Sequence, residues 1–187
     1  MRRYRLAAAG AAGVIAALCV TTSANAITMV IGGLAGQCYN YAKDGRYDFS
    51  AQDVCSRALS AEPLSAHDRA GTYVNRGAML LRAKNYEAAH ADFREALRIQ
   101  PGMGEAHVGE GAYLITMQRY AEAEPLLTRG IELGIEEPEK GYYFRGVARW
   151  GRDDYKGAYL DFTKASQLKP GWSLPREQLA YFKVEQH

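Results

Sequence analysis

Residues 86–101 read YEAAHADFREALRIQP, and this stretch decides the fold. Its apolar residues recur at helical spacing, which places them along one face of a helix: Tyr86, Ala89, Phe93, Ala96 and Leu97. The small alanines allow a second helix to approach closely, while the aromatic rings fill the gaps beside them. Pro101 cannot continue a helix and ends this one. The stretch therefore predicts a helix that packs tightly against a helical neighbour.

The same arrangement returns twice further along the chain. Tyr86, Tyr120 and Tyr155 align at intervals of 34 and then 35 residues. Other positions share this register: Gly77, Gly111 and Gly146; Tyr73, His107 and Tyr142; Ala89, Ala123 and Ala158; Phe93, Leu127 and Phe162; Ala96, Gly130 and Ala165. The longer second interval indicates one inserted residue around positions 134–138. Because one helix pair cannot bury its apolar stripe alone, we expect repeated pairs of this kind to stack.

This pattern resembles that of the tetratricopeptide repeat family, in which large and small residues recur over about 34 residues. Residues 70–103 and 139–172 match well, whereas 104–137 lacks the closing proline and 34–63 fits only in its second helix. The resemblance implies an all-α fold, with antiparallel helix pairs stacked in a right-handed superhelical solenoid. We expect about three repeats, a degenerate N-terminal pair and a C-terminal capping helix.

Capping signals predict where several helices begin. Ser50 and Ser65 are each followed three residues later by an acid, as in a capping box, and Asp153-Asp154 precedes another helix. Gly77 is expected to face Ala89 on the second helix of its pair. Pro125 should bend its helix slightly without breaking it. Residues 174–184 are amphipathic and predict the capping helix.

Residues 1–26 have the features of a secretory signal peptide. Basic residues precede an apolar run, and Ala24-Asn25-Ala26 is an A-x-A cleavage site, so we expect cleavage after Ala26. An uncleaved membrane anchor and a lipidated Cys19 are the alternatives. After cleavage, we expect the mature chain to consist of a degenerate helical pair over 27–66 and a solenoid with its capping helix over 67–187. This organisation implies a periplasmic or secreted bacterial protein.

Removal of the signal changes the charge of the chain. The whole sequence has 23 basic and 21 acidic side chains, and residues 1–26 hold three arginines and no acid. The mature chain therefore has 20 basic side chains against 21 acidic ones, a formal charge of −1. Nothing in this balance favours nucleic acid or an anionic membrane surface. We expect no nucleic-acid partner and no membrane span in the mature form.

The exported chain keeps two cysteines, Cys38 and Cys55, on its first two predicted helices. Two cysteines in an oxidising compartment predict a disulfide, with two buried thiols as the alternative. Such a bridge closes a loop of about 17 residues and stabilises the fold by roughly 3 kcal/mol in the chain-entropy description.

The sequence contains no constellation typical of an active site or a metal site. Its four histidines are scattered, and His107 occupies a large packing position of the repeat. Asp153 and Asp154 stand where a turn meets a helix, so capping explains them better than acid–base catalysis. We therefore expect no catalytic residue, no cofactor and no metal ion.

The resemblance places the ligand in a concave groove lined by the first helix of each repeat. By position it predicts these groove residues: Val74, Asn75, Ala78, Leu81, Arg82, Val108, Ala112, Ile115, Thr116, Tyr143, Val147 and Trp150. Burial of Tyr143 and Trp150 by the capping helix is the alternative. Only Asn75 and Arg82 match the carboxylate clamp of chaperone-binding members, so a clamp is not predicted.

The function implied is that of an exported, non-enzymatic scaffold that binds a protein or peptide. Two other classes remain open at this point. One is a cell-envelope enzyme subunit without a recognisable catalytic motif. The other is an assembly factor that self-associates through the Gly-rich stretch over 27–36.

Overall fold

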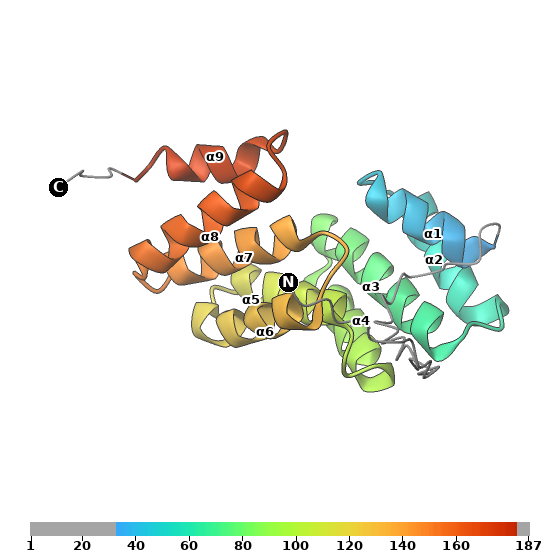
Figure 1. Cartoon of the computed structure of the whole chain (residues 1–187). Coiled ribbons are helices and arrows are strands. Elements are labelled where there is room, and N and C mark those ends of the chain that lie inside the picture. Colours follow the sequence, from blue (N-terminus) through green and yellow to red (C-terminus); the bar gives the residue numbers. More distant parts are fainter. Residues whose placement is uncertain (1–32, 183–187) are drawn as a thin grey trace, which may run out of the picture.

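The computed structural model describes residues 33–182, and every regular element in that range is an α-helix (Figure 1). The predicted signal peptide, Cys19 and His187 lie outside the described residues. The helices are α1 (Leu34–Lys43), α2 (Phe49–Ala61), α3 (Ala66–Arg82), α4 (Tyr86–Ile99), α5 (Gly104–Thr116), α6 (Tyr120–Leu133), α7 (Pro138–Trp150), α8 (Tyr155–Leu168) and α9 (Ser173–Leu179).

The helices form pairs that stack in chain order. The pairs are α1–α2, α3–α4, α5–α6 and α7–α8, and the first helix of each pair also packs against the first helix of the next. Figure 1 shows α1 and α9 standing on the same side of this stack, near its two ends. The all-α solenoid predicted from the sequence is confirmed.

The repeated glycines mark where the two helices of a pair touch. A Cβ atom added at Gly77 would lie 2.8 Å from the ring of Phe93, closer than side chains pack. The same relationship holds between Gly111 and Leu127, at 2.6 Å, and between Gly146 and Phe162, at 2.8 Å. All three large side chains are fully buried. The side chain nearest to Gly77 is thus Phe93, and Ala89, the predicted neighbour of Gly77, is also buried.

Two ion pairs connect the helices of the first and third repeats. Arg76 holds Asp92 with donor–acceptor distances of 2.8 and 2.7 Å, and Arg145 holds Asp161 at 2.9 and 2.8 Å. Both aspartates are buried. A two-point contact of this kind fixes the relative orientation of the two helices as well as their separation. Sequence analysis did not identify these pairs.

The observed caps agree with the sequence at two helices and differ at a third. Ser65 accepts a hydrogen bond from the Asp68 N–H, and Asp154 accepts one from the Gly157 N–H, as predicted. Helix α2 begins earlier than expected, because Asp48, not Ser50, accepts from the Ala51 N–H at 3.1 Å. A carboxylate is the stronger acceptor, since its hydrogen bond is charge-assisted.

Two further helices test sequence predictions. Helix α6 runs without a break through Pro125. Helix α9 covers Ser173–Leu179, so it is shorter than the predicted segment over 174–184. Tyr181 and Phe182 follow it in a turn and still pack onto the last repeat.

The N-terminal pair is joined by the Cys38–Cys55 disulfide, with a Cα–Cα distance of 4.9 Å. Both cysteines are fully buried, and Met79 of α3 lies beside the bridge, with its Sδ 3.8 Å from the Cys55 Sγ. The carboxylate of Glu62 holds the first turn of α1 from outside the helix, since the N–H groups of Leu34 and Ala35 donate to it at 2.6 and 3.0 Å. An anion at this end also suits the helix dipole.

Candidate partner-binding groove

A groove of about 600 Å³ opens on the side of the solenoid that carries α1 and α9. Residues of α1, α3 and α5 form one part of its lining, and the loop between α6 and α7 with the starts of α7 and α9 forms the other. Six of the residues predicted for the groove do line it: Val74, Asn75, Ala78, Arg82, Val108 and Ala112. The first helices of the first two repeats, α3 and α5, thus supply part of this lining.

The predicted residues of the third repeat lie outside the groove. The Trp150 ring centroid is 5.0 Å from that of Phe182 and 5.8 Å from that of Tyr181, and the Tyr143 centroid is 4.9 Å from that of Trp172. The C-terminal segment thus covers this end of the stack in the place of a further repeat. Burial raises the pKa of the Tyr143 hydroxyl above its ordinary value, and the nearby charge of Glu177 adds to that effect.

The remaining predicted groove residues also lie outside the lining of the groove. Leu81 and Ile115 pack against the central apolar core, and Thr116 donates its hydroxyl to the Tyr113 carbonyl oxygen at 2.6 Å. Val147 is half-buried on α7 and does not line the groove. Leu81, Ile115, Thr116 and Val147 therefore do not line this groove.

The floor of the groove is apolar and comes from more elements than expected. Alongside Val74, Ala78, Val108 and Ala112, it includes side chains that sequence analysis missed: Met79, Ile135, Phe144, Trp172 and Leu174. Ile135 belongs to the loop between α6 and α7, and Trp172 and Leu174 belong to the C-terminal segment. Apolar side chains from separate elements thus meet around one space.

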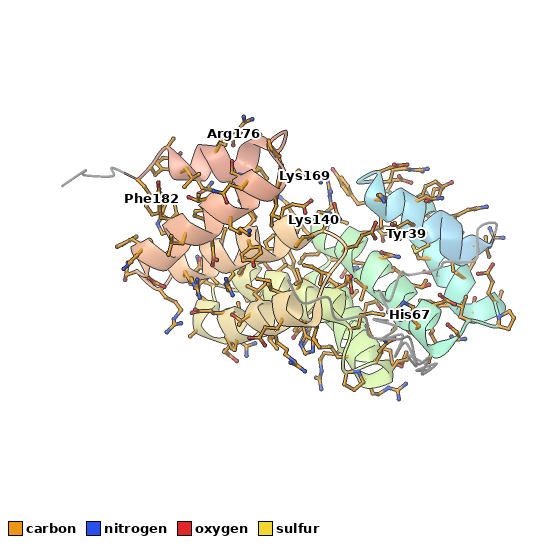
Figure 2. All side chains as sticks on the ribbon, in the orientation of Figure 1. Tyr39, His67, Lys140, Lys169, Arg176 and Phe182 are labelled. Carbon is orange, nitrogen blue, oxygen red and sulfur yellow. A yellow bond between two sulfur atoms is a disulfide. The ribbon has the colours of Figure 1, made fainter. Side chains whose placement is uncertain are left out.

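Charged residues surround this floor, and cations outnumber carboxylates. The cations are Lys43, Arg46, Arg82, Lys140 and Lys169, and the carboxylates are Glu105, Glu136 and Glu137. Figure 2 labels Lys140 and Lys169 on the α7–α9 side of the groove. Glu137 is paired with Lys140 and, at 3.4 Å, with Lys169. At the opposite end, the Arg82 guanidinium is exposed and lies 5.4 Å from the centroid of the Tyr47 ring.

Three side chains meet across the rim of the groove. The Tyr39 hydroxyl lies 2.6 and 2.8 Å from the two carboxylate oxygens of Glu136, and the Lys43 ammonium donates to Glu136 at 3.0 Å. The hydrogen bond from Tyr39, followed by that from Lys43, lowers the pKa of the Glu136 carboxyl against the opposing effect of burial. The pKa of Lys43 is raised, first by its hydrogen bond to Tyr39 and then by Glu136.

The histidines that drew attention in the sequence serve packing. His90 Nδ1 lies 2.9 Å from a Glu110 carboxylate oxygen, and its ring stacks on Tyr113 with centroids 4.4 Å apart. His107 Nε2 lies 2.9 Å from the Pro101 carbonyl oxygen. Between residues 33 and 182, no group of three or more His, Cys, Asp or Glu side chains is arranged to hold a metal ion.

None of the helices within residues 33–182 combines the length and apolar character needed to cross a bilayer.

A family model described as tetratricopeptide repeat matches residues 80–134, from the end of α3 to the turn after α6. This segment contains tetratricopeptide repeats. The pair α5–α6 in this segment has the contact of Gly111 with Leu127, and the pairs before and after it, α3–α4 and α7–α8, have the equivalent contacts of Gly77 with Phe93 and of Gly146 with Phe162.

Similar proteins agree with this assignment. The DnaJ homolog subfamily C member 7 homolog of Dictyostelium discoideum is 30% identical over 95 residues, which is 48% of this chain and 17% of that protein. The chain thus spans only a small part of the length of the curated relative that it matches.

Solved structures share the fold at lower identity. MamA from Desulfovibrio magneticus RS-1 is 20% identical, with a TM-score of 0.58 over 80% of this chain and 84% of that one. The Arabidopsis OM64 TPR domain is also 20% identical, with a TM-score of 0.57 over 62% of this chain and 95% of that domain. These likenesses concern the fold alone.

Proposed function

We propose that this protein is an exported, non-enzymatic tetratricopeptide-repeat scaffold that binds a protein or peptide through the groove. The observation that carries the proposal is the groove itself, where an apolar floor lies among charged residues. Its volume, about 600 Å³, falls within the range of about 300–1,000 Å³ that is usual for ligand pockets. Apolar side chains of a partner would be buried on the floor, and its polar groups would meet the charged rim.

Two polar residues of the rim, Arg82 and Asn75, can orient a partner in the groove. Arg82 presents an exposed guanidinium at the α1–α3 end, and Asn75 lies on the same helix α3. A guanidinium can form two parallel hydrogen bonds with a carboxylate, which adds geometric specificity. We assign Arg82 and Asn75 as polar contacts for the partner, and Val74, Ala78, Val108 and Ala112 as apolar ones.

Export and a periplasmic or secreted location are part of the same proposal. The sequence features of residues 1–26 support it, and so does the disulfide, because such bonds persist in oxidising compartments. N-terminal sequencing of the protein recovered from outside the cytoplasm tests this part. Mature chains should begin at Ile27, and chains that retain Met1 would contradict it.

The groove is tested by filling it. Selection from a phage-displayed peptide library on immobilised mature protein should yield peptides that bind wild type. Ala78→Trp places an indole in the groove and should weaken their binding at least about tenfold, a loss of about 1.4 kcal/mol. Ala91→Trp is the matched control, since Ala91 is exposed on α4 and does not line the groove. Peptides that bind both variants as they bind wild type would exclude the groove as the site.

A further inference from the structure

The groove is bridged by a contact between two parts of the chain that are far apart in sequence. Tyr39 and Lys43 lie on α1, and Glu136 lies in the loop between α6 and α7. Helix α1 packs on α2 and α3, so the side chains of Tyr39 and Lys43 are what connect it to this loop. Figure 2 shows Tyr39 on the α1 side and Lys140 and Lys169 on the other.

The loop that carries Glu136 is held firmly against α5. The Glu136 N–H donates to the Glu105 carboxylate at 3.1 Å. A Cβ atom added at Gly104 would lie 2.7 Å from Ile135 and 2.8 Å from the carbonyl oxygen of Gly134, so the loop backbone lies directly on that helix. The loop therefore places a carboxylate at the rim, over the groove.

Helix α1 is fixed just as firmly on its own side. The disulfide at Cys38, the residue before Tyr39, ties the helix to α2, and Glu62 holds its first turn. Tyr39 and Lys43 therefore move with the N-terminal pair as one body. The contact with Glu136 joins this body to the α5–α7 part of the solenoid.

The contact itself is exposed and breakable. The Lys43 side chain is 56% exposed and that of Glu136 is 43% exposed. Exposed ion pairs contribute little to stability and are weakened by salt. The contact can therefore open without unfolding any helix, which distinguishes it from the buried Arg–Asp pairs between helices.

We propose that Tyr39, Lys43 and Glu136 form a clasp that holds the groove closed at its rim and opens when a partner enters. This inference rests on the proposed function of the groove and adds its regulation. With the clasp closed, the N-terminal pair and the α6–α7 loop are held at a fixed separation. A partner that fills the space between them separates the two bodies, and the intramolecular contact competes with its entry.

The clasp is tested on the full mature chain without knowledge of the partner. Tyr39→Phe removes the hydroxyl and keeps every charge, whereas Glu136→Gln removes the charge and keeps the shape. Tyr155→Phe and Glu132→Gln are matched controls, because each removes an exposed polar contact outside the groove: Tyr155 with Asp153 and Glu132 with Arg129. Amide hydrogen exchange, followed by mass spectrometry, reports motion of segments 34–46 and 134–137.

In both clasp variants we expect exchange in these two segments to accelerate about two- to fivefold, as the loss of an exposed contact implies. Nile red, a neutral apolar dye, should bind the variants more tightly than wild type by a similar factor. Raising the salt concentration should bring wild type toward Glu136→Gln and change that variant little, because it has already lost the ion pair with Lys43, whereas Tyr39→Phe keeps the pair and should still respond to salt. The two controls should behave as wild type.

The outcomes separate this inference from the proposed function. If exchange in segments 34–46 and 134–137 of Tyr39→Phe and Glu136→Gln equals that of wild type, the clasp is excluded, whatever the dye does. The groove as a binding site would then still be decided by Ala78→Trp. If exchange accelerates but peptides selected on wild type bind the clasp variants no more tightly, the contact is structural and does not regulate entry, which also overturns the proposal.

Discussion

Arg145 of α7 and Asp161 of α8 hold each other in a two-point contact, at 2.9 and 2.8 Å, within the last repeat. The same Asp161 carboxylate accepts a third hydrogen bond from Arg149 at 2.9 Å. The hydrogen bond to Asp161 is the main reason why the pKa of Arg145 is raised above its ordinary value. One buried carboxylate thus compensates two guanidinium groups.

Asp161→Asn should therefore destabilise the protein by about 3 kcal/mol, because it leaves the Arg145 guanidinium without its buried counter-charge, whereas Arg149 keeps Glu124 at 3.0 Å. Chemical denaturation followed by circular dichroism measures this loss. Asp153→Asn is the control, since Asp153 is exposed and contacts only the Tyr155 hydroxyl. A change equal to that of the control would mean that solvent already screens the pair.

The contact between Gly77 and Phe93 makes a second prediction. Gly77→Ala adds a methyl group 2.8 Å from the ring, and overpacking of this kind costs about 1–3 kcal/mol. Gly102→Ala is the matched control, because nothing lies within 4 Å of the added atom there. The double variant Gly77→Ala/Phe93→Leu should recover part of the loss. Equal melting temperatures for the two single alanine variants would show that the ring moves aside freely.

Both partners of this glycine contact recur in register, although sequence analysis placed Ala89 opposite Gly77. Gly77, Gly111 and Gly146 align, and so do their large partners, so this periodicity can be read from the sequence alone. The Arg–Asp pairs obey the same register, since Arg76 aligns with Arg145 and Asp92 with Asp161. The pairs do not form a three-fold pattern, because the middle repeat carries Glu110 and Leu126 at the positions of the arginine and the aspartate. Extending the comparison from apolar to polar positions would have found them.

The groove was only half predictable, and for a physical reason. Val74, Ala78, Val108 and Ala112 lie on regular repeat helices, so the resemblance could assign them. Ile135 and Glu136 lie in a loop, where no periodicity relates sequence to position. Tyr39 and Lys43 lie on a degenerate pair with no repeat register. Residues from such segments meet only once the chain is folded, and they form the contact across the rim.

The disulfide provides a third prediction. Replacing Cys38 and Cys55 together by alanine should lower the free energy of unfolding by about 2–5 kcal/mol, since a constraint on the unfolded chain is lost. Thermal denaturation of the mature protein measures the change. Reducing agent should destabilise wild type and leave the double variant unaffected. Two alkylatable thiols in native exported protein would show that the bond does not form in its own compartment.

The Glu136 carboxyl makes a prediction about pH, and its sign follows from the lowered pKa. A carboxyl whose pKa is lower in the folded state stabilises that state above its unfolded pKa of about 4.3, and loses this effect as the pH falls through the folded value. Wild type should therefore be more stable than Glu136→Gln at neutral pH, and the difference should shrink as the pH falls below the unfolded pKa of about 4.3 and through the folded value.

Chemical denaturation of both proteins at a series of pH values measures that difference in free energy. Because Glu136 is substantially exposed, the difference at neutral pH should be small, and high salt should reduce it further. Glu132→Gln is the control, since Glu132 pairs with Arg129 only at 3.9 Å and lies away from the groove. Its stability relative to wild type should depend little on pH. A Glu136→Gln difference that stays constant as the pH falls from neutral to well below the unfolded pKa of about 4.3 would show that the carboxylate charge does not hold the clasp, because protonation would then have removed nothing.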